Sequence, residues 1–147
     1  MRRVLASLIV VAGLALVVTA TGSAAGSAAT VKTRHGKLGT FLVGTNGRTL
    51  YLFEKDKTKK STCSGDCATA WPPLLTTGKP KAAGKAKASL LGTTKRADGK
   101  TQVTYKGHPV YYFVQDKKAG DTKGQGVDGF GAEWYAMSPS GKKIDDD

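Results

Sequence analysis

A six-residue phrase that occurs twice constrains the fold of this chain most tightly. Residues 51–56 read YLFEKD and residues 111–116 read YYFVQD, so Tyr, Phe and Asp recur with identical spacing. A turn glycine stands four residues before each phrase, and a loop and then a tryptophan, Trp71 or Trp134, follow it. Matched landmarks in one order indicate an internal duplication, with two copies of one unit packed around a pseudo-twofold axis.

The repeated phrase has the pattern of a buried strand followed by a turn. Side chains two apart in a strand share a face, so Tyr51 and Phe53 point one way while Leu50 and Leu52 point the other. An Asp just past a strand end commonly accepts backbone N–H bonds and organises a turn. The phrase is thus an aromatic core strand with an Asp-capped loop, or one wall of a ligand groove. The candidate binding residues are Tyr51, Phe53, Asp56, Tyr111, Phe113 and Asp116.

Strand and turn signals dominate the rest of the chain, and they predict an all-β fold of two related antiparallel β-meander repeats packed as one small domain. Hairpin turns are expected at Asn46-Gly47, at Asp98-Gly99 and at Lys106-Gly107, and a further turn at Ser140-Gly141. The triplet LGT, at 38–40 and again at 91–93, is taken as another landmark of the duplication.

Two segments interrupt the strands. One short helical turn is expected near residues 64–71, capped by Ser64 or Asp66 and ended by Pro72-Pro73. Residues 76–89 carry four lysines and no acid, and they are expected to form a solvated, weakly structured basic linker. The predicted organisation is a signal peptide at 1–29, repeat 1 at 30–75 with the Cys63–Cys67 loop, the linker at 76–89, and repeat 2 at 90–147.

The N-terminus predicts export. A cationic start, an apolar run of 15 residues from Val4 to Val18 and a small-residue tail form a signal peptide, with cleavage after Ala25 or Ala29. The run is shorter than the roughly 20 residues that a membrane-spanning helix needs, so no transmembrane anchor is expected after cleavage. The expected location is secreted or in the cell envelope.

The charge balance favours acidic partners. Cleavage removes Arg2 and Arg3 and leaves 21 basic against 11 acidic residues, a net charge of +10. Such a surface suits an acidic cell-wall polymer or another anionic surface, and a small ligand is the other alternative. No nucleic-acid-binding motif accompanies the lysines, so nucleic acid is not expected as a partner.

The two cysteines have two readings. In an oxidising compartment an even count indicates a disulfide, and Cys63 and Cys67 lie one helical turn apart, within bridging distance. Alternatively, the two thiolates and His108 or His35 would suit copper(I). Calcium at Asp116, Asp121 and Asp128 is disfavoured because the D-x-D-x-D-G pattern is missing. No other cofactor is indicated.

Enzymatic activity is not expected. The chain has no G-x-S-x-G motif, and its two histidines leave no evident nucleophile–base pair. The remaining hypotheses are an exported binding or structural module, or an extracytoplasmic redox or copper protein using Cys63, Cys67 and a histidine.

Four motifs together resemble one known family: GRTLYLFEKD, STCSGDCATAWPPLL, KRADGKTQVTYKGHPVYYFVQDKKAGDTKGQG and EWYAMSP. The chain is similar over roughly residues 38–137 to the bacterial secreted repeat of unknown function, also described as predicted lipoproteins with a Tyr-x-aromatic-x-x-Asp motif. The resemblance implies an exported two-repeat envelope protein without a settled biochemical role. No cysteine stands directly after the apolar run, so the lipid anchor of the lipoprotein members is not expected here.

Overall fold

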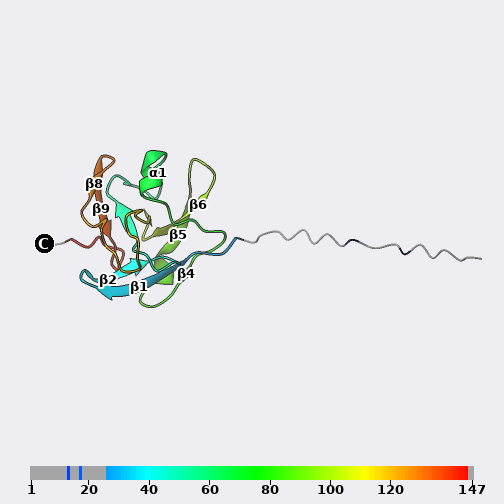
Figure 1. Ribbon diagram of the computed structural model, residues 1–147, viewed down its shortest axis with the longest axis horizontal. Helices are drawn as coiled ribbons and strands as arrows, with labels where there is room; N and C mark the ends of the chain where they lie inside the picture. The colour runs from blue at the N-terminus through cyan, green and yellow to red at the C-terminus, as the bar shows by residue number, and fades with distance from the viewer. Residues whose placement is uncertain (1–12, 14–16, 18–25, 146–147) are drawn as a thin grey trace, which may run out of the picture.

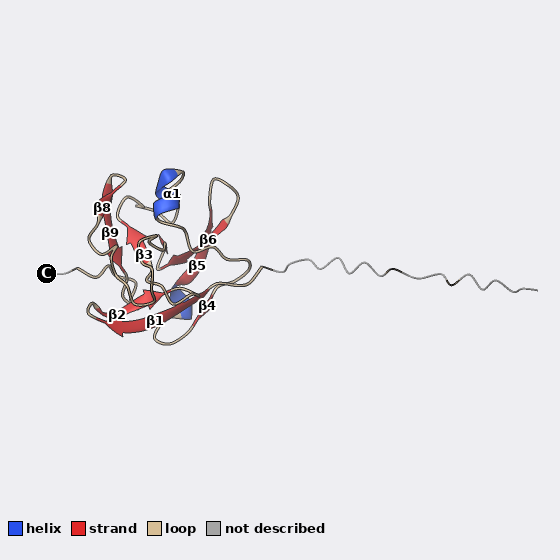
Figure 2. Cartoon of the chain, viewed as in Figure 1, coloured by secondary structure: helices blue, strands red, loops and turns tan. Residues whose placement is uncertain are grey.

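The computed structural model describes residues 26–145 together with Gly13 and Val17, so most of the predicted signal peptide lies outside the described residues. Strands dominate (Figure 2). The elements are β1 (Thr30–Gly36), β2 (Gly39–Val43), β3 (Tyr51–Phe53), α1 (Asp66–Ala70), β4 (Lys81–Ala82), a 3₁₀ turn (Ala88–Leu90), β5 (Leu91–Lys95), β6 (Thr101–Tyr105), β7 (His108–Pro109), β8 (Asp128–Gly129) and β9 (Ala132–Ala136). They form three small sheets, in the orders β2-β1-β4, β3-β9-β8 and β5-β6-β7. The all-β prediction is confirmed.

The predicted hairpin turns lie where the glycine pairs place them. β5 and β6 pair antiparallel across Asp98-Gly99, and β6 and β7 pair across Lys106-Gly107. At Asn46-Gly47 the amide of Gly44 donates to the carbonyl of Arg48, which closes the turn between β2 and β3. Gly47 and Gly107 both have φ near +80°, a conformation that glycine adopts without steric cost.

One landmark of the duplication is wrong. The hairpin of β1 and β2 turns at Lys37-Leu38, so the first LGT triplet begins in a turn, where Gly39 has φ +81° and pairs with Gly36. In the second triplet Gly92 lies within β5 and pairs with Thr104. Identical letters therefore occupy non-equivalent positions, because a three-residue match carries no information about register.

The two repeats are interlocked around the centre of the repeated phrase. Tyr51 and Tyr111 face each other as an antiparallel bridge, each donating its amide to the other's carbonyl, at 2.8 and 3.0 Å. β3 then pairs along its length with β9, which bears Trp134. In the other half the segment at Tyr111 pairs with the segment that follows Trp71, through an isolated bridge between Tyr111 and Pro73. The amide of Tyr112 donates to the carbonyl of Pro72 at 2.8 Å.

The segment at each tryptophan therefore pairs with a segment of the other repeat, so the two units exchange their tryptophan strands. The same exchange appears one strand further out. The amide of Leu42 in β2 donates to the carbonyl of Met137 at 2.9 Å, and the amide of Val103 in β6 donates to the carbonyl of Leu74 at 2.8 Å. The sequence distance from Trp71 to Trp134 equals that from Leu74 to Met137, so the two bonds are equivalent. Neither repeat contains all the strands of its own unit.

The short helix forms as predicted but without the predicted cap. α1 covers Asp66–Ala70, and its N-cap is Gly65, with no side-chain capping hydrogen bond. Ser64 and Asp66 therefore do not cap it. The helix ends at Trp71, since the following Pro72-Pro73 cannot continue it. Figure 1 shows α1 on the side of the body opposite β1 and β2. None of the helices in the described part of the chain is long and apolar enough to cross a membrane.

The lysine-rich segment is more ordered than its composition indicates. β4 pairs in parallel with β1, through Thr30 with Lys81 and Val31 with Ala82. The amide of Lys85 also donates to the hydroxyl of Thr33 at 3.1 Å. The segment is anchored because β1 has a free edge, and backbone groups at that edge gain partners by pairing. Its lysines stay exposed.

The core has two layers, one on each face of the repeated strands, as the alternation of side chains predicts. Tyr51, Phe53, Tyr111 and Phe113 pack with both tryptophans, both cysteines, Phe41, Val43 and Ala136 in one cluster. Leu50, Leu52 and Val110 pack in a second cluster with Ala29, Val31, Leu42, Leu74, Val103, Tyr105 and Met137. The two-sided burial fits strands that are apolar on both faces. Val114 departs from this pattern, because it is exposed at the strand end.

Candidate functional site

The centre of the molecule is a stack of four aromatic rings taken alternately from the two repeats. In order they are Phe113, Trp71, Trp134 and Phe53, with neighbouring ring centroids 4.0, 3.9 and 4.0 Å apart. The two indole planes differ by only 3°. Tyr51 meets Trp71 edge-on at 5.4 Å, and Tyr111 meets Trp134 in the same way at 5.1 Å. Edge-to-face and stacked contacts each add about 0.5–1.5 kcal/mol beyond their buried area.

Each tyrosine of the repeated phrase is hydrogen-bonded to the aspartate of the other copy. The Tyr51 hydroxyl donates to Oδ2 of Asp116 at 2.6 Å, and the Tyr111 hydroxyl donates to Oδ2 of Asp56 at 2.5 Å. All four side chains are buried. The spacing of the phrase is thereby explained: Tyr and Asp are both needed, and each copy supplies the partner that the other copy lacks.

The second oxygen of each aspartate closes a loop. Oδ1 of Asp56 accepts bonds from the amide and the hydroxyl of Thr62, both at 2.7 Å, and Oδ1 of Asp116 accepts the amide of Lys123 at 2.9 Å. The predicted capping role is therefore present, over loops longer than an Asx turn. The bond to the distant tyrosine was not predicted, since sequence reasoning placed each Asp only within its own repeat.

Burial controls the ionisation of these pairs. Burial, followed by the hydrogen bond to Asp116, raises the pKa of the Tyr51 phenol far above its ordinary value. Burial and the bond to Asp56 do the same to the pKa of Tyr111. Burial also raises the pKa of the Asp116 carboxyl, while the Tyr51 hydroxyl and the Lys123 amide oppose that rise. Both tyrosines are thus fixed as neutral hydrogen-bond donors.

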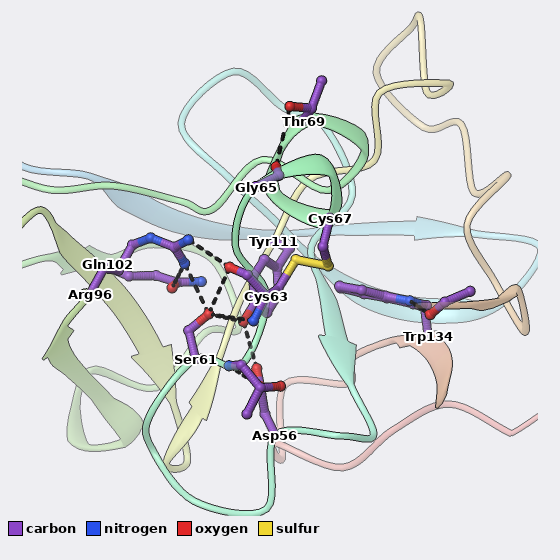
Figure 3. Close-up of a disulfide and its surroundings, with 12 residues drawn as sticks. Asp56, Ser61, Cys63, Gly65, Cys67, Thr69, Arg96, Gln102, Tyr111 and Trp134 are labelled. Atoms are coloured by element: carbon purple, nitrogen blue, oxygen red, sulfur yellow. Dashed lines mark hydrogen bonds between the residues drawn. A yellow bond between two sulfur atoms is a disulfide. The ribbon is translucent and has the colours of Figure 1, made fainter. Parts of the chain in front are cut away.

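The surroundings of Asp56 differ from those of Asp116, because a buried arginine, Arg96, lies near Asp56. The side chain of Arg96, only 6 % exposed, donates from Nη1 to the hydroxyl of Ser61 at 2.9 Å (Figure 3). That hydroxyl also bonds the phenol of Tyr111 at 2.7 Å. Arginine and aspartate are thus joined through two hydroxyl groups. Neither Arg96 nor Ser61 stands out in the sequence, where the one signal is an arginine beside the Asp98-Gly99 turn.

The cysteines form a disulfide, as the first reading predicts. Their Cα atoms are 5.3 Å apart, and both residues are buried next to Trp134 in the aromatic cluster. Nη2 of Arg96 donates to the carbonyl of Cys63 at 2.6 Å (Figure 3). The bridge therefore holds the loop against which the second repeat's arginine packs.

The alternative metal set is not brought together as free ligands. Both sulfurs are in the disulfide, and His108 lines a different cavity, with Lys106 and Glu54. Over residues 26–145 no cluster of three or more His, Cys, Asp or Glu residues has the placement of a metal site. Asp121 accepts the amides of Lys117 and Lys118, at 3.0 and 3.1 Å, and so stabilises its own loop.

The six candidate binding residues lie together, but inside the molecule. Tyr51, Asp116 and Tyr111 are fully buried, Phe53 is nearly so, and Asp56 and Phe113 are 5 % and 7 % exposed. Their observed contacts are with one another, with the two tryptophans and with the loops that the two aspartates close. A direct ligand contact by these side chains stays a prediction, and the surfaces that their loops present are the accessible part of this region.

These features define an all-β tandem-repeat protein with a single interlocked core and a disulfide-closed loop. The sequence profile of the family described as "secreted repeat of unknown function" matches residues 32–75 and again residues 92–138. The two matches cover more than half of the chain, which therefore belongs to this family. No curated protein and no solved structure matches the chain.

Proposed function

We propose that the protein is an extracellular, non-enzymatic module that binds an acidic cell-wall polymer through two equivalent cationic loops. The loops are residues 56–62 and residues 116–123, and each begins at a buried aspartate of the repeated phrase. The observation that carries the proposal is their common design: a buried carboxylate closes each loop, while lysines on the same loop stay exposed.

The first loop presents three lysines and no exposed acid. Lys57, Lys59 and Lys60 are exposed, and the carboxylate of Asp56 is turned inward to Tyr111 and Thr62. The ion pairs found among the described residues involve none of these three lysines. The loop therefore offers a concentrated positive field to solvent.

The second loop presents Lys117, Lys118 and Lys123, also exposed, beside two arginines of the first repeat. Nη2 of Arg48 donates to the carbonyl of Lys117 at 3.2 Å. The guanidinium of Arg34 lies against Gly120, so close that a Cβ at that glycine would be 2.9 Å from Nε. Glycine at this position lets the arginine lie along the loop.

A repeating polyanion suits such a surface better than a small ligand. Exposed lysines contribute weakly one by one, since single surface ion pairs are worth about 0–1 kcal/mol. A polymer engages many of them at once, and linked contacts multiply in effect. The exposed lysines of the 76–89 segment, Lys79, Lys81, Lys85 and Lys87, extend the positive surface along β1.

The test is chromatography of the protein, expressed from the full-length sequence, on immobilised polyphosphate, with uncharged dextran as the blank column. Two triple variants neutralise the loops, Lys57→Gln/Lys59→Gln/Lys60→Gln and Lys117→Gln/Lys118→Gln/Lys123→Gln. A matched variant, Lys95→Gln/Lys100→Gln/Lys106→Gln, removes three exposed lysines from the β5–β6–β7 region.

Each loop variant is expected to elute at clearly lower salt than the unmodified protein, and the matched variant at nearly the same salt. Elution that shifts equally in all three variants would reduce the interaction to net charge alone. Retention that does not respond to salt would refute an electrostatic partner.

A further inference from the structure

A cavity lies between the disulfide loop of the first repeat and the β5–β6 turn of the second. Its volume is about 450 Å³, and it is lined by residues 61–65 and Ala68 on one side and by residues 96–98 on the other. Ligand sites commonly have volumes of about 300–1,000 Å³ and combine apolar walls with a few convergent polar groups. The cavity has this character, with alanine and cysteine walls, three hydroxyl side chains and one arginine.

Arg96 lines this cavity with donors left over. A guanidinium carries five N–H bonds, of which Nη1 has two. Nη1 donates to Ser61 and to Oε1 of Gln102, at 2.9 and 2.8 Å, and Nη2 donates one bond to the carbonyl of Cys63. Nε is buried and has no acceptor. A buried charged donor without an acceptor is costly, so an unpartnered Nε–H calls for an explanation.

The nearest carboxylate stands just out of reach. Oδ2 of Asp98 is 4.0 Å from Nε, which is too long for a hydrogen bond, and its side chain is 51 % exposed. The other oxygen, Oδ1, accepts the amide of Lys100 at 2.9 Å and so holds the residue in its turn. Asp98 therefore lines the cavity without forming a hydrogen bond to the arginine Nε.

We propose that this cavity binds a carboxylate group, which accepts the free Nε–H and the second N–H of Nη2 of Arg96. Two parallel N–H bonds on one edge of a guanidinium are the arrangement that a planar carboxylate matches. The charge balance selects the ligand. Arg96 contributes one positive charge and Asp98 one negative charge, so a monoanion is accommodated better than a dianionic phosphate.

Two sources share this chemistry: the C-terminal carboxylate of a peptide and the carboxylate of an acidic sugar. The cavity adjoins the first cationic loop at Ser61 and Thr62, but none of that loop's lysines lines it. The probes are monomeric acids, which scattered surface lysines do not bind. Carboxylate binding at this cavity is therefore measured independently of polymer binding.

The experiment is an NMR titration of ¹⁵N-labelled protein that follows the Nε–H of Arg96 and the amides of Ser64 and Ala97. The probes are N-acetylglycine for a peptide terminus, glucuronate for a sugar acid, and methyl phosphate at a pH where it is dianionic. The variants are Asp98→Asn, which keeps Oδ1 for the Lys100 amide, and Arg96→Lys.

One of the two carboxylates, or both, is expected to shift the Arg96 resonance saturably, and the better one identifies the source. Asp98→Asn should tighten that binding about tenfold, because it removes a negative charge that repels the ligand. Arg96→Lys should abolish binding. Asp98 is exposed, so the Asp98→Asn variant still tests carboxylate binding if Arg96→Lys fails to fold.

Three results would overturn the proposal: no saturable shift at Arg96 in either the unmodified protein or Asp98→Asn, equal affinity in those two proteins, or tighter binding of methyl phosphate than of both carboxylates.

Discussion

Replacing Tyr51 by phenylalanine tests the reciprocal bonds at the centre of the fold. The change removes one hydroxyl and leaves the ring in place. Two buried groups lose a partner: Oδ2 of Asp116, which accepts the bond at 2.6 Å, and the amide of Gly124, which donates to the hydroxyl at 3.2 Å. A hydrogen bond to a charged group is worth about 1.5–3 kcal/mol, and a buried group left unpaired costs about 1–3 kcal/mol.

The expected loss in the free energy of unfolding is therefore about 2–4 kcal/mol. For a domain of this size it corresponds to a fall in Tm of roughly 8–15 °C. The assay is guanidinium unfolding followed by tryptophan fluorescence, since both indoles lie in the same cluster as Tyr51. Tyr135→Phe is the matched control. Its hydroxyl bonds Glu133 at the surface, so the control should lose less than about 0.5 kcal/mol.

The loss should also depend on pH. Burial raises the pKa of Asp116, so the folded protein holds this proton more tightly than the unfolded chain does. Proton binding by Asp116 therefore stabilises the fold fully below the ordinary aspartate pKa. This stabilisation is lost as pH rises through the higher pKa of Asp116 in the folded protein. The Tyr51 hydroxyl opposes the rise, so its removal raises the folded pKa of Asp116 further. Tyr51→Phe should therefore lose more stability at neutral pH than at about pH 4.

A Tyr51→Phe variant within about 0.5 kcal/mol of the unmodified protein would refute the reasoning, because it would mean that the Tyr–Asp pair has no net role in stability. A full-sized loss that does not change with pH would refute only the electrostatic part. Adding Asp116→Asn to Tyr51→Phe should remove the pH dependence, since no carboxyl then titrates at this position.

Three further predictions follow from the interlocked fold. Cleavage at a protease site inserted within residues 79–85 should leave both fragments in one particle by size-exclusion chromatography, because each unit contains strands of both; two separated species would contradict the exchange. Gly124→Ala should cost several times more stability than Gly129→Ala, since a Cβ at Gly124 would be 2.8 Å from the rings of Trp71 and Tyr51. N-terminal sequencing of secreted protein should place cleavage after Ala25, since Ala29 is buried and its amide bonds the hydroxyl of Thr76; an N-terminus at residue 30 would contradict this.

Local features of the fold were predictable from the sequence because they depend on neighbouring residues. The turns at Asp98-Gly99 and Lys106-Gly107 require a positive φ, and the glycines report it directly. The alternation around Tyr51 gives the two faces of the strand, and both faces are buried as expected. The helical turn ends where Pro72 makes it end.

Pairing between distant strands was not predictable in the same way. A strand's pattern shows which face it buries, but many partners satisfy the same pattern, and a meander takes the nearest one. β3 instead pairs with β9, and the LGT triplets mislead because they match in letters and not in register. Arg96 was missed for a related reason: an isolated arginine beside a turn is usually solvated, and only its distant partners show that it is buried.

The sequence identified the residues of the candidate site but not what those residues do. The repeated phrase brings Tyr51, Tyr111, Asp56 and Asp116 together, as the duplication suggests, yet the residues bind one another across the repeat boundary. A sequence motif shows that its members are needed at that spacing. It does not show whether they face a ligand or each other, because that depends on which strand covers them.

The exchange of tryptophan strands has a consequence for a chain that belongs to a secreted family. β3 pairs along its length with β9, close to the C-terminal end of the described residues. In a chain that is delivered N-terminus first, the half built on β3 stays incomplete until the strand that carries Trp134 has emerged. The strands of the other half, by contrast, all precede Trp134 in the chain. The strand at the end of the second repeat is therefore the element that completes the first half of the fold.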